Sequence, residues 1–67
     1  MEQDKKLYSV KVRRSGDHSK PTEVFRCNDS TLAGWVYVGA MVDGNVVEVE
    51  QYFKDRLERR CDKQKGF

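Results

Sequence analysis

Residues 32–47 read LAGWVYVGAMVDGNVV, and any hydrophobic core of this chain must form on them. The stretch holds the only Trp of the protein, one Asp, and no Lys, Arg or Glu, whereas the sequence on both sides is dense in charge. Its residues leave two structures open: a strand that turns back into a second strand, or a buried helix.

The composition of the stretch favours a strand. Residues 35–38, Trp-Val-Tyr-Val, are the aromatic and β-branched types that suit a pleated, half-buried surface. Asp43-Gly44 favours a tight turn, because both residues tolerate a positive φ. In the following Val46–Phe53, apolar and polar residues alternate as in a half-buried strand. These features predict a hairpin.

A helix over residues 31–43 is the alternative. Residues 28–30, Asn-Asp-Ser, can cap its start, and Gly44 can end it. Gly34 and Gly39, however, each cost about 1 kcal/mol relative to Ala inside a helix. No face of this helix is polar, so it would have to be buried all round, which a chain this short hardly allows. We therefore favour the hairpin.

The flanking sequence predicts two more strands and a helix. Leu7–Arg13 alternates apolar and polar residues, and Thr22–Cys27 predicts a second strand after a polar loop. Residues 54–65 lack Gly and Pro and favour a helix, with Phe53, Leu57 and Cys61 recurring every fourth residue. In another interpretation this helix begins at Asn45 and replaces the second strand of the central hairpin.

The predicted fold class is therefore α+β: a small three- to four-stranded antiparallel β-sheet with one C-terminal amphipathic α-helix across one face. Residues 1–67 are predicted to form a single small domain, of which the polar leader 1–6 frays. A domain of 67 residues is near the lower limit of what folds without help, so a homodimer is expected.

Charge and hydropathy restrict the class of protein. A net charge of +2 is too small to indicate a nucleic-acid protein by itself. The sequence has no apolar run that could span a bilayer and no signal-peptide pattern after Met1. We expect a cytoplasmic protein that begins at its own Met and has no membrane partner.

The residues that could carry chemistry do not form a catalytic or metal-binding pattern. His18 lies beside Asp17 in a polar loop and is expected to be solvated. Cys27 and Cys61 are far apart and lack a second His, so they predict an intracellular thiol pair rather than a zinc site. We predict that the protein is not an enzyme and uses no cofactor or metal.

An uncovered sheet face suggests a binding function. A two-residue hairpin loop exposes the aromatic side chains of the central strand, and a three-residue loop buries them, because a one-residue slip exchanges the two faces. We predict a non-enzymatic protein-binding module, a small intracellular accessory or regulatory factor of bacterial or phage type by size, which docks on a larger protein or on its own copy. The candidate partner-binding residues are Trp35, Tyr37, Met41 and Tyr52.

Nucleic-acid binding is the alternative function. It would use the basic loop 13–20 and the basic C-terminal helix, and its candidate residues are Arg13, Arg14, Lys20, Arg56, Arg59, Arg60 and Lys63. Acidic residues are interleaved with these cations, whereas a nucleic-acid site gathers positive charge on one face. Segregated cations on the folded chain would favour nucleic acid, and interspersed ones a protein partner.

Overall fold

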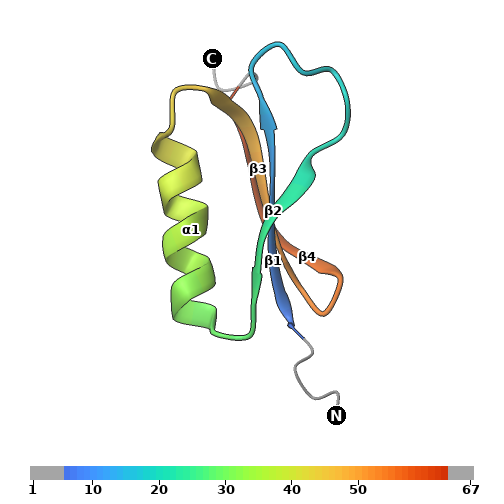
Figure 1. The fold of residues 1–67 in the computed structure, drawn as a ribbon, viewed down its shortest axis with the longest axis vertical. Coiled ribbons are helices and arrows are strands. Elements are labelled where there is room, and N and C mark those ends of the chain that lie inside the picture. Colours follow the sequence, from blue (N-terminus) through green and yellow to red (C-terminus); the bar gives the residue numbers. More distant parts are fainter. Residues whose placement is uncertain (1–5, 64–67) are drawn as a thin grey trace.

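The computed structural model describes residues 6–63, which form one antiparallel sheet with one helix packed on it (Figure 1). The elements are β1 (Tyr8–Arg14), β2 (Thr22–Cys27), α1 (Ser30–Val42), β3 (Val46–Phe53) and β4 (Arg56–Asp62), and the strand order is β2-β1-β3-β4. The predicted α+β class and antiparallel sheet are confirmed. The predicted position of the helix is wrong, because it lies between β2 and β3 and not at the C-terminus. Residues 1–5 of the expected leader, and 64–65 of the expected helix, lie outside the described residues.

The central stretch is a helix, which corrects the hairpin prediction. Its start is capped by Asp29, whose Oδ1 accepts hydrogen bonds from the backbone N–H groups of Thr31 (2.9 Å) and Leu32 (3.4 Å). Ala33 and Tyr37 on its inner side are buried against the sheet. This burial and the cap outweigh the helix penalties of the Gly and Val residues. The turn predicted at Asp43-Gly44 exists, but it joins α1 to β3.

Residues 56–62 form a strand where a helix was predicted. Lys54 and Asp55 have φ values of 53° and 65°, and this left-handed two-residue turn reverses the chain into β4. β4 then pairs with β3, with Val49 opposite Cys61. A spacing of four residues fits a strand as well as a helix, because four is a multiple of the two-residue strand period. The recurrence of apolar residues at every fourth position therefore did not distinguish a strand from a helix.

The sheet has one face covered by α1 and one face that α1 leaves uncovered (Figure 1). The core lies under α1 and consists of Val10, Val12, Tyr37, Val46 and Val49. On the other side, here called the open sheet face, the central strands carry Ser9, Lys11, Arg13, Glu48, Glu50 and Tyr52. The helix itself, the only one in the described part of the chain, is too short to cross a membrane.

Candidate functional site

The side of α1 that points away from the sheet is apolar and exposed. Apart from the exposed Thr31 in the first turn, this outer face consists of four apolar side chains and one glycine: Leu32, Trp35, Val38, Gly39 and Val42. At 100° per residue they fall within about a third of the helix circumference. Trp35 and Val42 are 74% and 76% exposed, and Val38 and Leu32 are 50% and 45% exposed. In the described part of the chain, no other helix or strand lies on the side of α1 that points away from the sheet (Figure 1).

This outer face is unusual for a surface helix. A helix packed on one side normally presents charged and polar residues to water. No residue of Ser30–Val42 is charged, so apolar side chains occupy the outer side of the helix as well as the side packed on the sheet. The exposed apolar area is roughly 500 Å², within the range where patches on small proteins are often functional.

Both ends of α1 are fixed to the rest of the fold. The N-terminal end is capped by Asp29, as described above. At the C-terminal end, Lys63 donates hydrogen bonds from Nζ to the carbonyl oxygens of Met41 and Asp43, both at 2.8 Å. Arg14 Nη1 lies 3.9 Å from Asp43 Oδ2. The outer face is therefore presented on an anchored element, which limits the entropy lost when it docks.

The inner side of α1 is held by an arginine of β4. The guanidinium carbon of Arg59 lies 4.1 Å from the centroid of the Tyr37 ring, and its Nε donates a hydrogen bond of 2.7 Å to Gln51 Oε1. Burial raises the pKa of the Tyr37 hydroxyl above its ordinary value, with a further contribution from Cys61, while the cation of Arg59 acts in the opposite direction. Tyr37 is thus a core residue that orients the helix.

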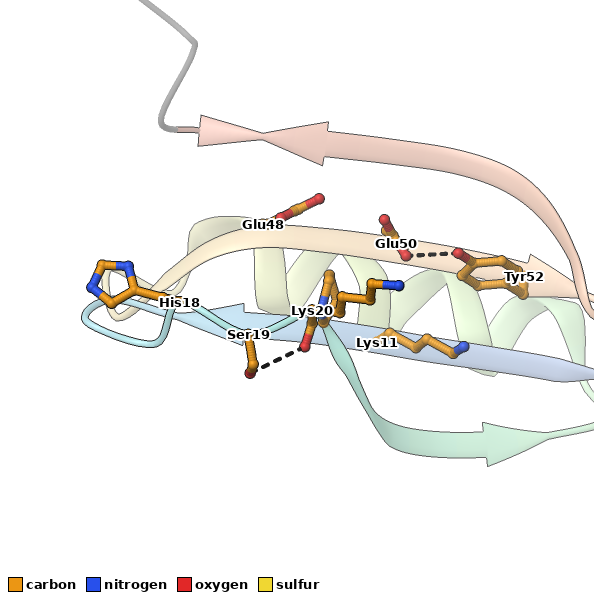
Figure 2. Close-up of a pocket in the computed structure, with 8 residues that line it drawn as sticks. Lys11, His18, Ser19, Lys20, Glu48, Glu50 and Tyr52 are labelled. Atoms are coloured by element: carbon orange, nitrogen blue, oxygen red, sulfur yellow. Dashed lines mark hydrogen bonds between the residues drawn. The ribbon is translucent and has the colours of Figure 1, made fainter.

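The open sheet face contains a hollow of about 440 Å³ beside the β1–β2 loop (Figure 2). Its lining consists of Lys11, His18, Ser19, Lys20, Pro21, Glu48, Glu50 and Tyr52. Figure 2 shows the loop residues at one end and the side chains of β3 along the side. Cations and carboxylates thus line the same hollow.

The carboxylates of the open sheet face are paired with other side chains of the same chain. Glu48 Oε1 lies 3.0 Å from Arg13 Nε, and both side chains are largely buried. Glu50 accepts a hydrogen bond of 2.8 Å from the Tyr52 hydroxyl and lies 3.9 Å from Arg60 Nη1. The bond to Glu50 raises the pKa of Tyr52, because it stabilises the protonated hydroxyl. These contacts link β1, β3 and β4 across the open sheet face. The face therefore carries both positive and negative charges.

The structure does not bring the four predicted partner-binding residues together. Trp35 lies on the outer face of α1, but Tyr37 is buried in the core and Met41 packs against that core. Tyr52 lies on the open sheet face, on the opposite side of the sheet. The outer face includes Leu32, Val38 and Val42, which sequence reasoning missed. Their helical spacing relative to Trp35 was the available signal.

The predicted nucleic-acid-binding residues are dispersed over the fold. Arg13 and Arg60 lie beside carboxylates of the open sheet face, and Lys20 lines its hollow. Arg59 and Lys63 contact α1 from the other side of the sheet. The remaining two are Arg14 near Asp43 and exposed Arg56 at the start of β4. The loop 13–20 and the C-terminal strand therefore do not form one basic face.

The three residues considered for chemistry in the sequence lie on three different segments of the fold. His18 is exposed in the β1–β2 loop. Cys27 and Cys61 are free thiols on β2 and β4, which are separated by two strands, too far for a disulfide. Within residues 6–63, no three His, Cys, Asp or Glu side chains are grouped so that they could hold a metal ion.

Comparisons of the chain with protein-family models, with curated proteins and with solved structures gave no match. The two surfaces that could carry a function are the outer face of α1 and the open sheet face.

Proposed function

We propose that this protein is a non-enzymatic protein-binding module that docks through the outer face of α1. The observation that carries the proposal is the exposure of Trp35 and Val42, each about three-quarters exposed on a helix side without charge. Tryptophan is enriched among the residues that dominate protein–protein binding energy, because it removes a large apolar area from water. By its size the protein is an accessory or regulatory factor.

The distribution of charge supports this class over nucleic-acid binding. The cations of the open sheet face alternate with carboxylates: Lys11 is opposite Glu50, and Arg13 is opposite Glu48. A strand of nucleic acid lying along this face would bring its phosphates close to both glutamates. The outer face of α1 offers no cation for phosphate contact.

A matched pair of substitutions tests the proposal. Val38 on the outer face and Val24 on the edge strand β2 are both 50% exposed. Val38→Lys places a charge in the proposed interface without disturbing the fold, because Lys is a better helix former than Val. The wild-type protein, immobilised, should retain a protein partner from an extract of the cells that make it, or from a solution of its own chain. Val38→Lys should lose that partner, and Val24→Lys should keep it.

Retention of the same partner by Val38→Lys would contradict docking through α1. A titration with single- and double-stranded oligonucleotides at low and physiological salt tests the second class. Binding that persists at physiological salt and is lost in Lys11→Ala would replace the proposal with nucleic-acid recognition on the open sheet face.

A further inference from the structure

We propose that the outer face of α1 docks on a second copy of this chain, forming a two-fold dimer in which the two helices pack antiparallel. The inference rests on the proposed protein-binding function and names the partner. It is carried by three features of the helix: the spacing of its exposed residues, its charge, and its exposed area.

The spacing of the outer face matches that of paired helices. Leu32, Trp35, Gly39 and Val42 follow each other at intervals of three, four and three residues, the spacing that keeps one seam of a helix against a partner helix. A two-fold axis between Val38 and Gly39 places Trp35 of one copy opposite Val42 of the other. These are the two most exposed large apolar side chains among residues 6–63, and in the dimer each contacts the other across the axis.

The same axis places Val38 opposite Gly39. A Cβ built on Gly39 meets no atom of its own chain within 4 Å, so the space beside this glycine is open to a side chain from outside. The surface is thus self-complementary in size, with large residues facing small ones, as a two-fold interface requires. In antiparallel packing the two helix dipoles point in opposite directions, so the positive end of one helix lies near the negative end of the other, which is favourable.

The charge of α1 favours a second copy over a lipid surface. Two copies can approach without burying any ion, because Ser30–Val42 carries no charge. A helix that lies on a membrane carries Lys and Arg around its apolar face, and these residues attract anionic lipid. The helix Ser30–Val42 itself has no Lys or Arg with which to attract such a membrane.

The exposed area predicts a reversible dimer. Two outer faces together remove on the order of 1,000 Å² from water, which is the lower limit for a specific interface. Such an area is typical of dissociation constants in the micromolar range or weaker. The monomer and the dimer should therefore both be present at accessible concentrations.

Sedimentation equilibrium and Trp fluorescence test the dimer on the intact protein. With rising concentration, the mass should increase from 7.8 kDa toward twice that value. The emission of Trp35, the only Trp, should shift to shorter wavelength over the same range as its ring leaves water. Val38→Lys should remain monomeric with unshifted emission, whereas Val24→Lys should behave like the wild-type chain.

A charge exchange tests the antiparallel pairing. Trp35→Glu and Val42→Lys should each be monomeric alone, and their mixture should recover a dimer, because position 35 of one chain faces position 42 of the other. The Trp35 ring of the Val42→Lys chain then packs on the unchanged Val42, so its emission shifts. A mixture of Trp35→Glu with Val42→Glu should not associate.

The outcomes separate this inference from the proposed function. A wild-type chain that stays monomeric up to millimolar concentration overturns the dimer; if it still retains another protein in a Val38-dependent manner, the docking function stands. A dimer that survives Val38→Lys also overturns the inference, because the two copies then associate through another surface; the docking function is then decided by whether Val38→Lys retains the partner. A dimer that Val38→Lys abolishes but that the charge exchange does not restore overturns the antiparallel pairing.

Discussion

Arg59 lies over the ring of Tyr37, with its guanidinium carbon 4.1 Å from the ring centroid, although the two residues come from an edge strand and from the helix. The same guanidinium group is bonded to Gln51 at 2.7 Å. The contact therefore joins β3, β4 and the inner side of α1, whereas Trp35 is exposed on the outer side.

Replacing Arg59 should destabilise the fold. We expect Arg59→Ala to lower the free energy of unfolding by about 1–2 kcal/mol, through loss of a cation–π contact and a hydrogen bond to Gln51. Arg59→Lys should recover less than half of this loss, because an ammonium group cannot stack and donate in the same fork. The control is Arg56→Ala at the exposed start of β4, which should change stability by less than about 0.5 kcal/mol. If urea denaturation showed that Arg59→Ala and Arg56→Ala change the free energy of unfolding equally, the Arg59 contact would not be stabilising.

Gly34 leaves room for Arg59 on the inner side of α1. A Cβ built on Gly34 comes within 3.5 Å of Arg59 Nη2, an ordinary van der Waals distance. Gly34→Ala should therefore raise the free energy of unfolding by about 0.5–1 kcal/mol, through the better helix propensity of Ala. Gly34→Leu should lose this gain, because a longer side chain displaces the guanidinium group. Thermal melts of the two variants test the difference, and a destabilised Gly34→Ala would contradict it.

Val49 and Leu57 should differ sharply in their contribution to stability. Val49 is fully buried at the centre of the sheet, and Val49→Ala should cost about 2 kcal/mol or more, by lost burial and the cavity left behind. Leu57, once expected on the buried stripe of a helix, is 46% exposed on β4. Leu57→Ala should therefore cost less than about 1 kcal/mol. A melt in which Leu57→Ala is the more damaging variant would mean that β4 packs differently.

Two carboxyl groups outside the core should have a pKa below the ordinary value of their residue type. Hydrogen bonds from Arg26, and then from Ser9, lower the pKa of Glu23, and hydrogen bonds from Ser19 lower the pKa of Asp17. A lowered pKa in the folded state contributes stability above the ordinary carboxyl pKa, and this contribution is lost as the pH falls through the folded value.

Nuclear magnetic resonance titration of the carboxyl carbons separates the two sites. Arg26→Gln should move the pKa of Glu23 upward more than Ser9→Ala does, because the bond from Arg26 is the larger cause. Ser19→Ala should change the pKa of Asp17 alone, since the serine that bonds to Asp17 lies in the β1–β2 loop. A shift of Glu23 in the Ser19 variant would show that the two sites are coupled.

The sequence alone determined the strands that bury one face. β1 alternates apolar and polar residues from Tyr8 to Arg13, and β3 alternates them from Val47 to Glu50, as expected for strands with one buried face. The expected bounds of Thr22–Cys27 and Val46–Phe53 are those of β2 and β3. The charged open sheet face follows from the same pattern, since Lys11 and Glu50 occupy its wet positions.

Only the tertiary structure decided the conformation of residues 32–42 and therefore which side chains form the proposed docking surface. In a strand, Trp35 and Tyr37 share one face, and Val36 and Val38 share the other. In α1, Trp35 and Val38 point outward, while Val36 and Tyr37 pack on the sheet. A stretch that is apolar on every side carries no periodicity to distinguish these arrangements. Burial of Tyr37 between α1 and the sheet, beside an arginine twenty-two residues further along the chain, favours the helix, and no local pattern contains that contact.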